Sequence, residues 1–213
     1  MKEKIKEHSK IEEKLKVKLA KIEEIIHSNQ RNAVKVKIIN GILGKLTDEF
    51  VDIHHKSLTD EMTGFVNRWF LSEFLRKEIQ YSRRYKQSLT VAAVDIDFLK
   101  YINDTYGHIA GDKAIVRVAK AIKESIRSAD VVARIGGDEF IIVFPSTTAK
   151  AAERVVKRIK ETTKNIRVKE GFKLGVSLGV AELNKKHKLA EDLIDSADKD
   201  LYEAKKDRIN VNL

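Results

Sequence analysis

Apolar residues in the first quarter of the chain recur at helical intervals. Two series with spacings of three or four residues flank a polar stretch at 28–32: Ile11, Leu15, Leu19, Ile22 and Ile26, then Ile39, Leu43, Leu46, Phe50 and Ile53. This pattern predicts two amphipathic helices over residues 1–57, joined as a helical hairpin. Such helices bury little apolar surface alone, so we expect a dimerisation and signal-relay segment that pairs with a second copy as a coiled coil or bundle.

From residue 58 onward, strand-like apolar runs alternate with helical patterns. The expected helices cover 67–84, 111–125, 150–163 and 189–206, and the expected strands cover 89–95, 130–135, 139–144 and 173–181. Helices between strands, with one tight hairpin, predict an α/β sandwich of the α+β kind. Its central sheet is expected to be mostly antiparallel and flanked by helices, in a second domain over residues 58–213.

Composition narrows the class of protein without identifying a partner. The 213 residues include no cysteine, which excludes disulfides and thiolate metal sites. The longest apolar run, at 140–144, is far too short for a membrane span, so we expect a cytoplasmic protein. The net charge of +10 suits nucleic acid, anionic lipid or phosphate ligands equally. Because lysines and glutamates are interspersed, we interpret the charge as a solvated surface and expect no nucleic acid polymer as a partner.

The first candidate for chemistry is the pair Asp95 and Asp97, at the end of a strand with almost no polar residue. Residues two apart on a strand share a face, so both carboxylates can point the same way. Acids at the end of an apolar strand are costly unless a cation or donors compensate them, and magnesium prefers oxygen ligands. Helix capping by Asp97 is the alternative explanation.

The second candidate is the segment from Gly136 to Glu139, between two strand-like runs. The glycine pair predicts a two-residue hairpin turn with positive φ angles. Asp138 and Glu139 follow the glycines directly. If the hairpin lies beside Asp95, three or four acids converge on one point, and a divalent ion is the simplest way to balance their charges.

These residues resemble the GGDEF family of diguanylate cyclases, whose signature is Gly136-Gly137-Asp138-Glu139-Phe140. The resemblance covers residues 58–213. Other motifs in the family's order and spacing are Asp60-Glu61-Met62-Thr63-Gly64-Phe65-Val66-Asn67-Arg68, Asp95-x-Asp97, Lys100, Asn103-Asp104, Gly107-His108 and Gly111-Asp112. The resemblance implies a palm-like nucleotide-cyclase fold and a homodimer whose facing domains each hold one GTP. The 3′-hydroxyl of each GTP then attacks the α-phosphate of the other, giving cyclic di-GMP and two pyrophosphates.

The resemblance also implies roles for the acids. Asp95 and Asp138 would coordinate Mg²⁺ (or Mn²⁺) together with the backbone carbonyl of Ile96. Glu139 would orient or deprotonate the attacking hydroxyl, with Asp97 in a supporting role. Divalent ions suit this reaction because they neutralise the charge that spreads over the phosphate oxygens.

Substrate contacts carry over in the same way. Asn103 and Asp112 match the guanine-binding pair, and the remaining expected contacts are Phe98, Leu99, Lys100, Lys205, Gly136 and Gly137. Two departures from the family pattern stand out. Ile209 replaces the usual phosphate-binding arginine, for which the neighbouring Arg208 is a doubtful substitute, so GTP affinity is expected to weaken. Leu99 replaces a frequent phenylalanine, which is a milder change.

A product site is expected at Arg127 and Asp130, which match the family's R-x-x-D inhibitory motif, with Arg158 from the next helix. A planar guanidinium can pair with phosphate or guanine and stack on a base. A surface ion pair between Arg127 and Asp130 is the alternative. For the whole chain the alternatives to an active, feedback-inhibited cyclase are a catalytically silent receptor for cyclic di-GMP and a helical signalling scaffold.

Overall fold

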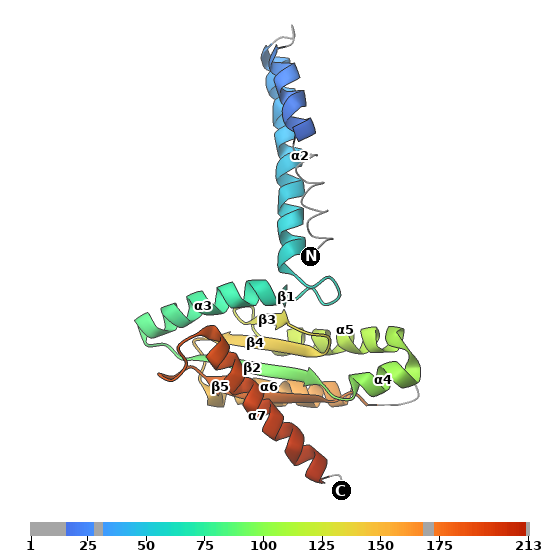
Figure 1. Cartoon of the computed structure of the whole chain (residues 1–213), viewed down its shortest axis with the longest axis vertical. Helices are drawn as coiled ribbons and strands as arrows, with labels where there is room; N and C mark the ends of the chain where they lie inside the picture. Colours follow the sequence, from blue (N-terminus) through green and yellow to red (C-terminus); the bar gives the residue numbers. More distant parts are fainter. Residues whose placement is uncertain (1–15, 28–31, 168–172, 212–213) are drawn as a thin grey trace. The chain divides into compact units, whose positions relative to one another are not determined.

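The computed structural model describes residues 16–27, 32–167 and 173–211 (Figure 1). The chain divides into two compact units, Met1–Ser57 and Leu58–Leu213. In the first unit a helix covers residues 16–27 and a second, α2, covers Asn32–Leu58. The Nζ atom of Lys35 donates to the carbonyl of Ile26 at 2.8 Å, so the facing ends of the two helices lie close together.

Among the described side chains of residues 16–46, the apolar ones are exposed or half-buried, and none is fully buried. Those with substantially exposed side chains are Val17, Leu19, Ile26, Val34, Val36 and Leu43. Ile11 and Leu15, which open the first predicted series, lie outside the described residues. A pair of helices with this much exposed apolar surface has a face that a partner could cover.

The second unit is built on one sheet with the strand order β1-β3-β4-β2-β5. The strands are β1 (Val66–Asn67), β2 (Leu89–Ile96), β3 (Val131–Arg134), β4 (Glu139–Pro145) and β5 (Val176–Glu182). β1 runs parallel to β3, and the other neighbours are antiparallel. The predicted mostly antiparallel sheet is therefore confirmed. The sequence did not predict β1, because two residues are too few to set a pattern.

Five helices accompany the sheet within the second unit: α3 (Arg68–Tyr85), α4 (Leu99–Tyr106), α5 (His108–Ser125), α6 (Ala149–Lys164) and α7 (Ala190–Val211). α4 is a helix of eight residues that the sequence indicated only as a helical turn. β5 begins at Val176 rather than near Lys173, which instead forms an isolated bridge with Arg167. α7 continues five residues beyond the predicted end at 206.

The two faces of the sheet carry separate apolar cores, because side chains alternate along each strand. Ala92 and Val94 pack with residues of α5 and α6, whereas Val91 and Ala93 pack with residues of α3 and α7. β2 is buried from Leu89 through Val94, as expected for a strand covered on both faces. The same alternation directs the next side chain, Asp95, to the α3 and α7 face.

Gly179 sets the distance between β5 and α7. A Cβ atom there would lie 2.0 Å from the backbone nitrogen of Leu201 and 2.3 Å from the carbonyl oxygen of Ala197. The two backbones therefore approach more closely than any side chain allows. Beside this contact, the Val180 N–H donates to the carboxylate of Asp200 at 2.7 Å, which ties the edge strand to the helix.

We expect Gly179→Ala to destabilise the second unit by about 1–3 kcal/mol or more, because the methyl group must push α7 away from β5. Urea unfolding followed by the fluorescence of the only tryptophan, Trp69 on α3, measures this. Gly137→Ala is the matched control, since nothing lies within 4 Å of its added Cβ. Its effect should stay within about 0.5 kcal/mol. Equal stabilities for the two variants would contradict the close contact.

Candidate active site

The β2–β4 pairing brings Asp95 next to the hairpin between β3 and β4. Asp95 lies directly opposite Glu139 in the register, and the N–H of Ile96 donates to the carbonyl of Asp138 at 3.1 Å. Directly opposed residues of an antiparallel pair carry their side chains on the same face. The strand end and the hairpin tip, more than 40 residues apart in the sequence, therefore meet as the sequence predicted.

Asp95 has a cationic partner on α7. The Nζ atom of Lys205 lies 2.8 Å from the Oδ2 atom of Asp95, whose side chain is only 16% exposed. Burial raises the pKa of Asp95, and the charges of Asp138 and Asp97 raise it further, while Lys205 acts in the opposite direction. Positive charge beside Asp95 therefore stabilises its ionised form, and such an environment suits a cation held by carboxylates.

The expected convergence of three or four acids on one ion stays a prediction, although the charges of Asp97 and Asp138 do act on Asp95. Across residues 16–27, 32–167 and 173–211, no three acid, histidine or cysteine side chains are grouped so as to hold a metal. Asp97 accepts a hydrogen bond from the Oγ atom of Ser177 at 2.7 Å. The exposed Glu139 leans over Gly136, where its Oε2 atom would lie 2.5 Å from an added Cβ. The predicted donors Asp95, Asp138 and the carbonyl of Ile96 remain as neighbours, and these oxygen donors fit a magnesium ion.

The conformation of the hairpin also differs from the prediction. Arg134 pairs with Phe140, and both Ile135 and Gly136 donate their N–H groups to the carbonyl of Glu139 at 3.0 and 3.4 Å. The tip is therefore a three-residue loop, 136–138. Among the described glycines, only Gly64 and Gly107 have positive φ. A two-residue turn with positive φ is wrong here, and Gly136 instead leaves room for the side chain of Glu139 that lies against it.

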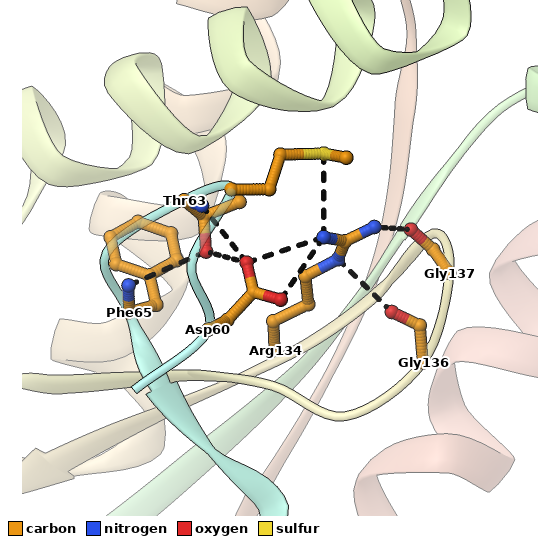
Figure 2. A network of polar contacts seen from close by, with 7 residues as sticks. Asp60, Thr63, Phe65, Arg134, Gly136 and Gly137 are labelled. Carbon is orange, nitrogen blue, oxygen red and sulfur yellow. Dashed lines mark hydrogen bonds and ion pairs between the residues drawn. The ribbon is translucent and has the colours of Figure 1, made fainter. Parts of the chain in front are cut away.

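Two arginines hold the carbonyl groups of the hairpin tip, and Figure 2 shows one of them, Arg134. The guanidinium of Arg134 donates to the carbonyls of Gly136 at 3.2 Å and Gly137 at 2.8 Å. Arg68 donates to the carbonyl of Ile135 at 3.2 Å. Three consecutive carbonyls are thus bonded, which fixes the backbone that presents Asp138 and Glu139.

Arg134 is in turn held by Asp60, in the turn that begins the second unit (Figure 2). Its Nη1 atom lies 3.2 Å from both carboxylate oxygens, and Asp60 also accepts from the N–H of Thr63 at 2.9 Å and its hydroxyl at 2.7 Å. Burial alone would raise the pKa of Asp60, but the Thr63 and Arg134 interactions lower it below its usual value. Asp60 belongs to a motif of the family, but no sequence pattern predicted a role for Arg134. The sequence signal for such a role was Arg134 itself, a charged residue inside the otherwise apolar run 131–135.

The proposed guanine-binding residues come from the junction of α4 and α5. A Cβ atom on Gly111 would lie 1.8 Å from the Oδ1 atom of Asn103, so the Asn103 side chain lies directly against this glycine. Asp112 is the next residue along α5. Gly107, with φ of +82°, turns the chain between the two helices and donates its N–H to the carbonyl of Asn103 at 2.9 Å. Gly111 is a positioning residue that the sequence analysis did not single out.

The expected phosphate loop lies at the start of α4. Phe98 has φ of +59° and is 60% exposed, whereas Leu99 is only 7% exposed and belongs to the core. Phe98 gives the helix no side-chain capping hydrogen bond. The N–H groups of the first turn of a helix favour anions. Only the backbone of Leu99 is thus available to a ligand, while Lys100 is exposed beside it.

α7 contains both Lys205, which matches the family pattern, and Ile209, which departs from it. Lys205 pairs with Asp95, as described above. Ile209 and Arg208 lie on the last turns of the same helix, but their side chains lie outside the described residues. The expected effect of Ile209 on GTP affinity therefore stays a prediction.

Comparison with known proteins identifies the family. The family model described as "Diguanylate cyclase, GGDEF domain" matches residues 57–211. The chain belongs to the GGDEF family. Diguanylate cyclase A of Treponema denticola is 39% identical over 158 residues, which are 71% of this chain and 43% of that protein. Diguanylate cyclase DosC of Escherichia coli is 36% identical over 173 residues, or 79% of this chain and 37% of that protein.

A solved GGDEF domain supports the fold. The GGDEF domain of DgcB from Caulobacter crescentus, crystallised in complex with c-di-GMP, superposes with a TM-score of 0.67 at 28% identity, covering 70% of this chain and 91% of that one. This GGDEF chain spans less than half the length of the two curated relatives. Within its described residues, no helix combines the length and the apolar character needed to cross a bilayer.

The predicted product-site residues of this GGDEF domain lie where α5, α6 and β3 approach one another. Asp130 accepts from the backbone N–H of Arg127 at 2.8 Å, forming a tight turn before β3. Among the described residues, no ion pair joins the Arg127 guanidinium to Asp130. The side chain of Arg127 is also exposed. Arg158 on α6 donates to the carbonyl of Ser125, two residues before Arg127. The three predicted residues are therefore neighbours.

The lowered pKa of Asp60 makes its contribution to stability dependent on pH. In the unfolded chain the Asp60 carboxyl takes up a proton near pH 4, whereas in the folded protein its lower pKa keeps it ionised there. The stabilisation by ionised Asp60 is therefore complete above about pH 4. It is lost as the pH falls through the pKa of the folded state. We expect Asp60→Asn to cost about 1–3 kcal/mol at neutral pH and progressively less below pH 4. Tryptophan-monitored urea unfolding across this range tests it. The exposed neighbour variant Glu61→Gln should show neither effect, and a pH-independent loss in Asp60→Asn would contradict the assignment.

Proposed function

We propose that this chain is a diguanylate cyclase, which joins two GTP molecules into cyclic di-GMP and releases two pyrophosphates. Residues 58–213 form the cyclase domain, and residues 1–57 form a dimerisation and signal-relay segment. The carrying observation is that the Asp95 strand end adjoins the hairpin bearing Asp138 and Glu139, with Lys205 supplying positive charge. The two relatives described above, both named as diguanylate cyclases, support the same activity.

Asp95, Asp138 and the backbone carbonyl of Ile96 would hold Mg²⁺ or Mn²⁺. When bound, the ion would neutralise charge on the phosphate oxygens. Glu139, exposed beside Asp95, orients the 3′-hydroxyl of GTP and accepts its proton. The O3′ atom then bonds to the α-phosphorus of the second GTP, while the bond to the bridging oxygen breaks and pyrophosphate leaves with that electron pair. Two such steps close the ring.

The remaining predicted contacts select and orient GTP. Asn103 and Asp112 bind guanine, and a carboxylate can accept from the ring N–H and the amino group that adenine does not present together. A buried acceptor left unpaired by ATP would cost roughly 1–3 kcal/mol. The phosphates lie at the start of α4, near the backbone of 98–100 and the glycines of the hairpin tip. Lys205, which pairs with Asp95 in this structure, contacts the triphosphate of bound GTP.

The reaction requires two copies of the chain, because each domain holds one GTP and the two nucleotides must face each other. The exposed apolar side chains of residues 16–27 and of α2 support pairing through the first unit. Burial of such side chains between two copies is favourable at roughly 25 cal/mol per Å² of apolar surface. A homodimer joined there would keep the two cyclase domains at high local concentration.

Product inhibition is proposed at Arg127, Asp130 and Arg158. The exposed guanidinium of Arg127 is available to a phosphate or a guanine, and Asp130 orders the turn that carries it. Arg158 lies beside the same turn through its bond to the carbonyl of Ser125. The similarity to a domain crystallised with c-di-GMP is consistent with binding of the product.

A silent receptor for cyclic di-GMP is the second candidate, favoured by one observation. Ile209 stands where the family usually has a phosphate-binding arginine. The receptor would retain binding through Arg127 and Asp130 without synthesis. The acids of the hairpin and Asp95 favour the enzyme, because binding of the product at a separate site does not need them.

Incubation of the purified chain with GTP and Mg²⁺ should yield cyclic di-GMP and pyrophosphate, quantified by chromatography. Glu139→Gln should slow turnover by about 10²–10⁴-fold, because the variant cannot accept the proton, and Asp138→Asn should lose comparable activity. The control Glu153→Gln, an exposed acid on α6, should retain full activity. Specific activity should fall on dilution as dimers dissociate. Product binding without synthesis would refute the enzyme and favour the receptor.

Arg127→Ala should retain synthesis and lose inhibition by cyclic di-GMP, because the variant lacks the guanidinium that pairs with the product. Progress curves with added product measure the effect as a rise in the inhibitory concentration of about tenfold or more. Lys123→Ala removes a nearby exposed cation on α5 and should leave inhibition intact. Undiminished inhibition in Arg127→Ala would show that the assignment is incorrect.

A further inference from the structure

The structure contains a basic pocket that the proposed reaction does not use. It lies between the end of α3 and the loop from β5 to α7, has a volume of about 460 Å³, and is lined by residues that include Ser82, Arg83, Lys86, Asn184, Lys185 and Lys188. We propose that this pocket binds a small, free phosphate-bearing molecule. Its volume falls within the roughly 300–1,000 Å³ of ordinary ligand sites.

The pocket is far from both sites described above. The pocket is formed by residues just before β2, which begins at Leu89, and just after β5, which ends at Glu182. Because Glu182 pairs with Thr90, both segments lie at the starting end of β2. Asp95 and the hairpin lie at the other end of β2. The pocket also belongs to the α3 and α7 face of the sheet, whereas Arg158 lies on α6, which packs on the opposite face. A ligand here would not compete with GTP or with the product for the same side chains.

Charge indicates an anionic ligand. The two segments, 82–88 and 183–189, together contain six lysines and arginines and no aspartate or glutamate. Cations from both segments line the pocket, so like charges face each other across it. Such repulsion is relieved by a bound anion, and the concave shape concentrates the positive potential.

Two features distinguish the pocket from an ordinary lysine-rich surface. Arg83 is fixed, because its guanidinium donates to the carbonyl of His187. His187 is only 6% exposed, and its ring bonds the N–H of Asn184 at 3.1 Å and the hydroxyl of Ser196 at 3.0 Å. A guanidinium held by a buried loop residue loses less freedom when it binds a ligand.

Ser82 supplies the second feature. It is 1% exposed and lines the pocket, yet its hydroxyl has no hydrogen-bond partner among the described residues. A buried hydroxyl without a partner costs about 1–3 kcal/mol. A phosphate oxygen would accept from the cations of the pocket and, once the occluded Ser82 side chain turns toward it, from this hydroxyl. Phosphate is therefore a better fit than a carboxylate, because its three or more acceptor oxygens can satisfy donors from both segments.

The test is calorimetric titration of the full chain with pyrophosphate and with inorganic phosphate, in EDTA to exclude divalent ions. Saturable binding is expected, and the double variant Arg83→Gln, Lys188→Gln should raise Kd by about tenfold or more, because two charged donors are lost. Lys77→Gln, an exposed cation of α3 outside the pocket lining, is the matched control. Lys205→Gln reports any binding at the candidate active site. The proposal is overturned if the double variant binds phosphate as the parent does. It is also overturned if Lys77→Gln or Lys205→Gln loses as much binding as the double variant.

Ser82→Ala keeps the test decisive if the double variant folds poorly. Removing a hydroxyl without a partner should leave the melting temperature unchanged or raise it, while phosphate binding weakens. If Ser82→Ala binds phosphate as the parent does, the pocket is not the site. Phosphatidylglycerol vesicles form a separate arm, in which parent and double variant should behave alike. Loss of vesicle binding in the double variant, with free phosphate binding unchanged, would assign the basic residues to a lipid surface and overturn the proposal.

Discussion

The guanidinium of Arg134 is the contact on which the arrangement of the candidate active site depends. It bonds the carbonyls of Gly136 and Gly137, while Asp60 neutralises its charge from a turn more than 70 residues earlier. Hydrogen bonds that involve a charged group are stronger than neutral ones. The side chain of Arg134 is also largely shielded from water. The loop that presents Asp138 and Glu139 is therefore held by side-chain chemistry rather than by the intrinsic preference of its glycines.

The other half of the site is fixed by packing. Asp95 ends a strand that is buried on both faces, and its partner Lys205 comes from α7, which can approach β5 only because Gly179 has no side chain. The pairing of Lys205 with Asp95 thus depends on the close backbone contact between Gly179 of β5 and α7. A change of one methyl group there acts on the charge environment of Asp95 without touching it, because a rigid helix transmits the displacement.

The sequence predicted those parts of the fold that local patterns determine. The apolar run from Leu89 to Val94 indicated a doubly covered strand, and the turn residues with flanking apolar runs indicated the β3–β4 hairpin. The turn conformation was wrong, because the bonds from Arg134 come from tertiary structure and not from the glycine pair. The same reason explains why the Lys205–Asp95 pair and the contact of Gly111 with Asn103 were not foreseen. Each joins segments whose proximity exists only after the sheet and helices have assembled.

The outer edge of β5 affects how two copies of this domain can meet. β5 is an outer strand of the sheet, and exposed outer strands invite a second sheet to add on through backbone hydrogen bonds. The carboxylate of Asp200 already accepts the outward N–H of Val180, so that position offers an incoming strand no donor. Strand addition would lose a hydrogen bond at this position, so contacts along this border would depend more on side chains, which separate more readily than merged sheets.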